Sequence, residues 1–75
     1  PVTLYVNNLD KPGFIGALGQ LLGEAGINIA TFHLGRTAAG EEAIALIGID
    51  AVPPADMMET LEALPQVRYA KVLTF

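Results

Sequence analysis

The sequence has no cysteine and no serine, and His33 is its single histidine. Without cysteine no disulfide can form, and a structural zinc site lacks its usual ligand set. The missing serine and cysteine also exclude the nucleophiles of the common hydrolase triads, and spacing places no base beside any threonine. We therefore expect neither catalytic residues nor a metal site. His33 is expected to be an ordinary surface residue, with a contact across a subunit interface as the alternative.

Positive charge is also scarce, because only four lysines and arginines stand against eight acidic residues. A net charge of −4 cannot build the basic surface through which proteins neutralise nucleic-acid phosphates. No apolar stretch approaches the roughly 20 residues that a membrane span needs, and the first residues lack the charged start of a signal peptide. We therefore expect a cytoplasmic protein that binds neither nucleic acid nor a membrane.

The chain is short, and its 75 residues allow one small domain. Hydrophobic residues make up 52% of the sequence and charged residues 16%, which is the composition of a chain that folds. So small a core without a covalent link gains from pairing with a second copy, so we expect oligomerisation. Because the first residue is proline and not methionine, we expect residues 1–75 to be a single domain cut from a longer chain.

Hydrophobic patterns divide the chain into six elements. Period-2 alternation and β-branched residues predict four strands, at about residues 2–6, 27–34, 43–49 and 67–75. Helical spacing predicts two helices, at about residues 12–25 and 57–64. This order predicts an α+β fold of the ferredoxin-like βαββαβ type, a four-stranded antiparallel sheet with both helices on one face. The other face mixes polar and apolar residues, and either solvent or a second domain could cover it.

The first helix is expected to start in the run Asp10-Lys11-Pro12-Gly13. Asp10 could cap its free amides, and Pro12 suits a first helical turn. Gly26 is expected at its left-handed end. Three glycines inside this helix cost stability and, at spacings of three and four, share one face: Gly16, Gly19 and Gly23. They are expected to pack tightly on the sheet, and a helix-to-helix contact between subunits is the alternative.

Polar residues flank both ends of this helix. Asn8 and Asp10 precede it, near a helix N-terminus whose free amides suit a small anion. Asn28 follows the far end, on the order of 20 Å away at about 1.5 Å per residue. One ligand site could collect Asn8, Asp10 and Asn28 only across two chains, and the alternative gives them local roles in turns and caps. The pair Glu41-Glu42 is expected to be solvated, because neighbouring residues of a strand point to opposite faces.

One stretch of the sequence resembles the signature of the ACT domain family. It comprises the run Asp10-Lys11-Pro12-Gly13, then Ile15, Leu18 and Leu22, and the run Ala25-Gly26-Ile27-Asn28-Ile29. It is similar in particular to the C-terminal ACT domains of bacterial D-3-phosphoglycerate dehydrogenases, most strongly from Leu4 to Arg36. The resemblance implies a regulatory domain without enzymatic activity of its own. It places the NAD cofactor and all catalytic residues in a parent catalytic domain outside these residues.

The resemblance also implies partners and site residues. ACT domains of this kind pair through their sheet edges into homodimers and bind an amino acid, here L-serine, at the interface. The ligand-binding positions fall on Asn8, Asp10 and Asn28, and Pro12 and Gly13 form the supporting turn and helix start. The first of these positions is often histidine or tyrosine in the family, so Asn8 is a departure.

Two other functions stay open. One is an ACT-fold dimerisation module that has lost its ligand, in which the glycines and the polar set serve packing and caps. The other is a small acylphosphatase-like hydrolase, whose first loop would need an arginine where this chain has only Lys11.

Overall fold

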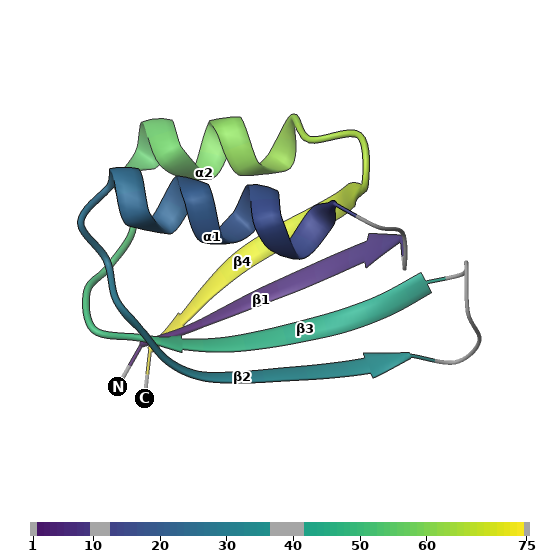
Figure 1. The fold of residues 1–75 in the computed structure, drawn as a ribbon, viewed down its shortest axis with the longest axis horizontal. Coiled ribbons are helices and arrows are strands. Elements are labelled where there is room, and N and C mark those ends of the chain that lie inside the picture. Colours follow the sequence, from purple (N-terminus) through teal and green to yellow (C-terminus); the bar gives the residue numbers. More distant parts are fainter. Residues whose placement is uncertain (1, 10–12, 37–41, 75) are drawn as a thin grey trace.

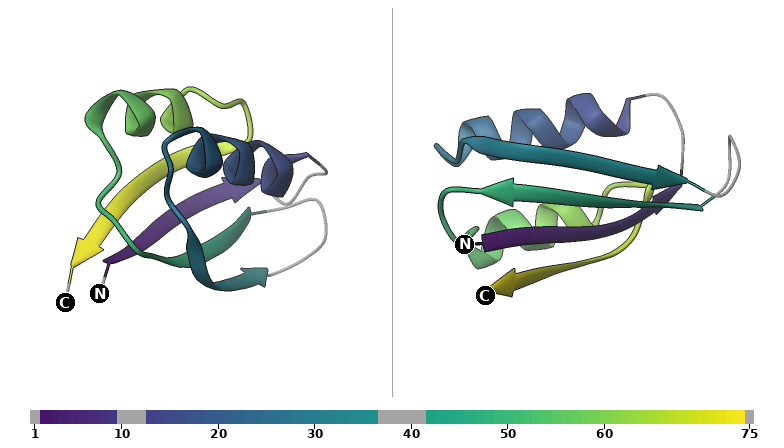
Figure 2. Two further views of the ribbon diagram at one scale, coloured as in Figure 1. Left: turned by 60° about the vertical axis from the view of Figure 1, so that its left-hand side comes forward. Right: turned by 90° about the horizontal axis from the view of Figure 1, so that it is seen from below.

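The computed structural model describes residues 2–9, 13–36 and 42–74. Its elements follow the predicted order: β1 (Val2–Leu9), α1 (Phe14–Glu24), β2 (Ile29–Arg36), β3 (Glu42–Ile49), α2 (Ala55–Glu62) and β4 (Val67–Thr74). The strands form one sheet in the order β2-β3-β1-β4, and each neighbouring pair is antiparallel. Both helices cover the same face of the sheet (Figure 1), and Figure 2 shows the sheet from further sides. The predicted ferredoxin-like fold is confirmed.

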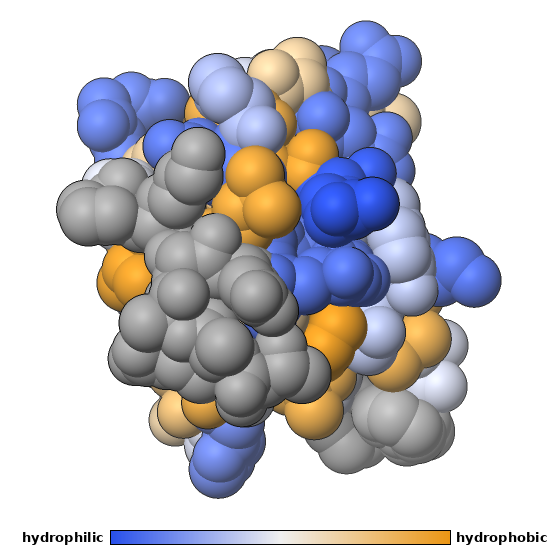
Figure 3. Space-filling view, turned by 90° about the vertical axis from the view of Figure 1, so that its right-hand side faces the viewer, coloured by the Kyte–Doolittle hydropathy of each residue, from blue (hydrophilic) through white to orange (hydrophobic). Residues whose placement is uncertain are grey.

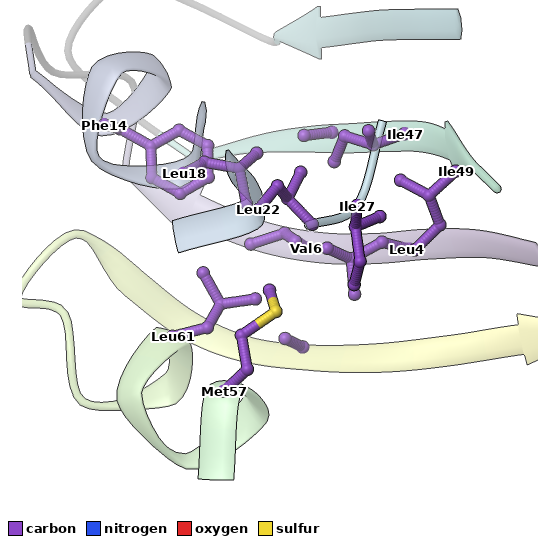
Figure 4. Packing of buried hydrophobic residues seen from close by; sticks show 12 residues of the cluster. Leu4, Val6, Phe14, Leu18, Leu22, Ile27, Ile47, Ile49, Met57 and Leu61 are labelled. Carbon is purple, nitrogen blue, oxygen red and sulfur yellow. The ribbon is translucent and has the colours of Figure 1, made fainter. Parts of the chain in front are cut away.

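The hydrophobic core lies between the sheet and the helices. Alternate residues of β1 and β3 face the helices, and helical spacing turns one side of α1 and of α2 toward them. Their side chains point toward one another (Figure 4): Leu4, Val6, Phe14, Leu18, Leu22, Ile27, Ile47, Ile49, Met57 and Leu61. Full burial of a side chain of this size contributes on the order of 1.5–3 kcal/mol. This packing holds β1 and α1 in fixed positions; Asn8 lies on β1, and Gly13 and Asn28 flank the two ends of α1.

Helix α1 begins later than predicted, at Phe14 rather than near residue 12. Gly13 occupies the N-cap position with a φ of 93°, a left-handed conformation that glycine adopts without strain. The chain therefore turns at Gly13 before the helix starts. At the other end Gly26 has a φ of 72°, which confirms the predicted left-handed end. The capping role predicted for Asp10 and the position of Pro12 lie outside the described residues.

The glycines of α1 do not pack against the sheet. A Cβ atom added at Gly16, Gly19 or Gly23 would meet nothing within 4 Å. The large apolar residues of the helix occupy the side that faces the sheet, and the glycines fall on the opposite side at the same helical spacing. The prediction of tight packing is therefore wrong, because spacing fixes which residues share a face but not which face meets the sheet. No helix of the described residues is long and apolar enough to cross a membrane.

Candidate functional site

The predicted site residues that the structure describes lie at two opposite ends of the molecule. Asn8 is near the end of β1, beside the start of α1, whereas Asn28 lies between α1 and β2 at the other end (Figure 1). The 11 residues of α1 separate them, a length of about 16 Å at 1.5 Å per residue. Asp10 and Pro12 lie outside the described residues. A single chain thus keeps Asn8 and Asn28 apart, and a joint site requires two chains.

Asn8 is a polar residue within the apolar layer. By two-residue alternation it follows Leu4 and Val6 on the helix-facing side of β1, and only 2% of its surface is exposed. Its Nδ2 donates a hydrogen bond to the carbonyl oxygen of Leu9 at 3.1 Å. Its Oδ1 is buried and accepts no hydrogen bond from the residues that the structure describes. An unsatisfied buried amide oxygen costs about 1–3 kcal/mol, so a donor brought by a ligand would be bound favourably here.

The start of α1 offers donors close to this acceptor along the chain. Gly13 has no side chain with which to cap the helix, and the first turn contains no acidic residue. Among the described residues, no side chain therefore neutralises the partial positive charge of the first amides, which suits a carboxylate. Apolar and hydrophilic residues lie side by side on this end of the molecule (Figure 3). An acceptor and a set of donors at one end are the chemistry that an amino-acid zwitterion needs.

Asn7 is a second buried asparagine and was not among the predicted site residues. It is 8% exposed, and its Nδ2 donates a hydrogen bond to Oε1 of Glu42 at 2.8 Å. Its Oδ1 is also buried, and no residue in the described part of the chain donates to it. Glu42 is exposed, as predicted, yet it is also bound to β1 rather than only solvated. Asn7 and Glu42 meet because of the register in which β1 pairs with β3. That register cannot be read from the sequence, so the contact could not be predicted. Glu41 lies outside the described residues.

Asn28 is held by Asp50. The backbone N–H of Asn28 donates to Oδ1 of Asp50 at 3.0 Å, and Nδ2 of Asn28 donates to Oδ2 at 3.1 Å. The backbone N–H of Asp50 donates back to the carbonyl oxygen of Asn28 at 3.3 Å. Asn28 therefore has the local role that the alternative gave it, in the turn into β2. The backbone N–H and one N–H of Nδ2 are used in these bonds, and Oδ1 of Asn28 is an acceptor.

The sheet face opposite the helices carries a pair of tyrosines. The rings of Tyr5 and Tyr69 stack with centroids 5.7 Å apart, and the Tyr69 hydroxyl donates to that of Tyr5 at 3.4 Å. This hydrogen bond is the main cause that raises the pKa of Tyr5 above 10.0, with burial and the charge of Glu42 adding to it. His33 is exposed and pairs with Leu46 on the same sheet. It is a surface residue, as expected.

A groove between the two helices is one concave surface of the described residues. It has a volume of about 270 Å³ and is lined by residues of both helices, with Leu21, Met57 and Thr60 beside the carboxylates of Glu24 and Asp56. It contains none of the predicted site residues. Within the described residues, no cluster of histidine, aspartate and glutamate side chains could hold a metal ion.

Comparison with known proteins places the chain among regulatory domains. The family model of the ACT domain matches residues 2–66. The chain is 32% identical over 72 residues to the D-3-phosphoglycerate dehydrogenase of Methanocaldococcus jannaschii and 33% identical over 70 residues to that of Bacillus subtilis. These matches cover 96% and 93% of this chain, but only 14% and 13% of the relatives.

The fold also matches a solved structure, the ACT domain from the GTP pyrophosphokinase of Chlorobium tepidum. The TM-score is 0.70, and the match covers 96% of this chain and 95% of that chain. The two sequences are 18% identical, so this likeness shows the fold alone.

Proposed function

Because this chain belongs to the ACT domain family and is homologous to the regulatory domain of D-3-phosphoglycerate dehydrogenases, we propose that it is an amino-acid sensor. It is a regulatory domain and not itself a dehydrogenase. In this proposal it binds a small amino acid, L-serine first of all, and thereby regulates a cytoplasmic NAD-dependent D-3-phosphoglycerate dehydrogenase. The catalytic residues and NAD belong to the catalytic domain of that enzyme.

The observation that carries the proposal is the buried oxygen of Asn8. Its Oδ1 is buried and accepts no hydrogen bond from the described residues, so a ligand whose N–H or O–H donor reaches it relieves the cost of the missing bond. The uncapped start of α1 suits the carboxylate of the same ligand. Asp10, by resemblance to the family, would supply the negative charge for the ammonium group. Bonds of this charge-assisted kind are about twice as strong as neutral ones.

A second chain would complete the site. Strand β2 forms one edge of the sheet, and it exposes Ile29 and Phe32 to 43% and 36%. Antiparallel pairing of two β2 strands would set the start of one beside the end of the other. Asn28 precedes β2, and Asn8 lies at the end of the molecule where β2 finishes (Figure 1). Edge-to-edge pairing therefore supports a shared site between Asn28 of one protomer and Asn8 of the other.

Binding across two chains also provides a means of regulation. A ligand shared by two domains holds them in one relative orientation. It changes the activity of a distant catalytic site only if its affinity differs between two states of the enzyme. A two-chain site meets this condition when one state brings the two ends together and the other separates them.

One observation favours the second candidate, a dimerisation module without a ligand. The glycine face of α1 is open, and Ile15 beside it is 47% exposed. Such a face would let the backbone of another helix approach closely, independently of any site at Asn8. In that case the chain would dimerise through α1 and would not respond to amino acids.

Calorimetric titration of the chain with L-serine, glycine and a panel of other amino acids distinguishes the two functions. The sensor predicts heat of binding with at least one amino acid at millimolar concentration, and a dimer at micromolar protein concentration by light scattering. If the protein is a dimer but no amino acid gives heat of binding, the sensor proposal fails and the dimerisation module takes its place. A single-chain mass across that range would contradict the shared site.

A further inference from the structure

The hydrogen bonds between Asn28 and Asp50 fix which side of the Asn28 amide faces outward. A carboxylate can only accept hydrogen bonds, whereas an asparagine amide has a donating nitrogen and an accepting oxygen. Since the side-chain group 3.1 Å from Oδ2 of Asp50 must be a donor, it is the Nδ2 of Asn28. Turning the amide over would set its oxygen against a charged oxygen. The bond therefore fixes Oδ1 of Asn28, an acceptor, on the side of the amide that points away from Asp50.

The fold brings the two residues together. Asp50 comes directly after β3 and Asn28 stands directly before β2, and the residues next to them, Ile49 and Ile29, are paired in the antiparallel ladder. The carboxylate also accepts the backbone N–H of Asn28 at 3.0 Å, so the main chain at Asn28 is held as well as its side chain. A ligand group meets this amide in a set orientation.

We infer that Asp50 is a specificity-determining residue that acts through Asn28: it orients the Asn28 amide so that this residue reads the ammonium group of an amino acid and not its carboxylate. The inference rests on the proposed amino-acid site and adds a residue to it. Asp50 need not touch the ligand. Its effect is to hold Oδ1 of Asn28 toward the ligand, and an acceptor in that place repels a carboxylate and favours a cationic donor.

Two variants test the orientation. In Asp50→Asn, the new amide oxygen can still accept the backbone N–H of residue 28. Its nitrogen then faces the side chain of Asn28, which must turn its own oxygen inward and its nitrogen outward. Affinity for L-serine should fall by about 10- to 150-fold, the usual loss when a charged group loses its hydrogen-bond partner. In the exchange Asn28→Asp with Asp50→Asn, the nitrogen of residue 50 again meets an acceptor, and a carboxylate oxygen points outward.

The exchange should restore affinity for L-serine to within a few-fold of the wild-type value. Asp56→Asn is the matched control, because it removes the same charge from an exposed aspartate at the first turn of α2. It should leave affinity within about two-fold, since the carboxylate of Asp56 accepts the neighbouring backbone N–H of Met57 and not that of Asn28. Circular dichroism and melting temperature report whether each variant is folded.

The possible results distinguish a failure of this inference from a failure of the proposed function. If wild-type protein gives no heat with any amino acid, the proposed function fails. If wild-type protein binds L-serine but Asp50→Asn binds it equally well, or the exchange variant folds and stays weak, the orienting role is overturned while the sensor stands. Should the exchange variant not fold, hydrogen exchange of the Asn28 side-chain amide in the wild-type chain decides. Protection of several-fold relative to free asparagine supports the bond to Asp50, and equal rates contradict it.

Discussion

The two ends of α1 hold asparagines in opposite environments. Asn8, at one end, is buried and its oxygen accepts no hydrogen bond from the described residues, whereas Asn28, at the other, is exposed and donates its backbone N–H and one side-chain N–H to Asp50. The oxygen of Asn8 lacks a hydrogen bond that a donor could supply, whereas the amide of Asn28 has a fixed orientation but little burial. A ligand would gain by satisfying the first and would be selected by the second. The difference suggests that the Asn8 end supplies affinity and the Asn28 end supplies discrimination.

The largest effect on amino-acid binding is expected from variants at the two ends, studied alone and combined in one dimer. These variants test whether the two ends belong to one site. Asp10→Ala should abolish amino-acid binding without unfolding the chain, because it removes the charged partner of the ammonium group. A mixed dimer of one Asp10→Ala chain and one Asn28→Ala chain should keep one intact site out of two. Calorimetry would then give half the wild-type stoichiometry with unchanged affinity. Two half-strength sites in the mixed dimer would show that each chain binds ligand by itself.

A change at Asn8 should separate affinity from stability. Asn8→Leu replaces a buried amide, whose oxygen accepts no bond from the described residues, by an apolar group of similar volume. The gain from removing that oxygen offsets the lost bond to the Leu9 carbonyl oxygen, so the free energy of unfolding should stay unchanged or rise by about 1 kcal/mol. Affinity for L-serine should fall by about 10- to 150-fold. Urea unfolding and calorimetry measure the two quantities.

Asn7→Leu is the control for that change, because Asn7 is also buried but faces the other side of β1. It should leave the affinity within about three-fold while losing the bond to Glu42. Equal losses of affinity in both variants would mean that β1, rather than the Asn8 oxygen, determines binding.

A smaller effect is expected midway between the two ends, on the open glycine face. Gly19→Ala adds a Cβ that meets nothing within 4 Å, so it should raise the free energy of unfolding by about 0.5–1 kcal/mol through helix propensity alone. Under edge-to-edge pairing the dissociation constant of the dimer should not change. Sedimentation equilibrium measures it, and a weakened dimer would favour contact through α1.

The smallest effect is expected at the tyrosine pair, on the sheet face opposite the helices. Tyr69→Phe removes the hydrogen bond that raises the pKa of Tyr5, so that pKa should move down toward 10.0, as followed by ultraviolet titration. Because the folded pKa is raised, any stability from this pair is complete below about pH 10 and is lost as the pH rises through the folded value. Amino-acid affinity at neutral pH should stay the same. A change in amino-acid affinity would show that the binding site extends onto the open sheet face.

Local patterns predicted most of the fold. Alternation along β1 and β3 and helical spacing along α1 and α2 follow from which side chains avoid water, so element order and sheet topology could be inferred. The start of α1 was placed too early because the left-handed turn at Gly13 depends on how the chain leaves β1. The face of α1 that carries the glycines was assigned wrongly, since periodicity does not say which of two sides meets the sheet.

The candidate site was less predictable than the fold. Asn8 and Asn28 were identified from the residues around α1, and their separation followed from the length of a helix. Asp50 and the bond between Asn7 and Glu42 were missed, because each joins residues that only strand register brings together. Sequence neighbours report local structure, whereas these contacts span 22 and 35 residues of the chain.

The antiparallel pairing of β1 with β4 has a mechanical consequence. Val2 and Thr74 are opposite each other at one end of that ladder, so both strands reach the same end of the molecule (Figure 1). A force that pulls these two points apart acts on one hydrogen-bonded pair at a time and opens the ladder like a zipper, instead of shearing all pairs together. The domain should therefore yield to tension at low force, beginning at Val2 and Thr74.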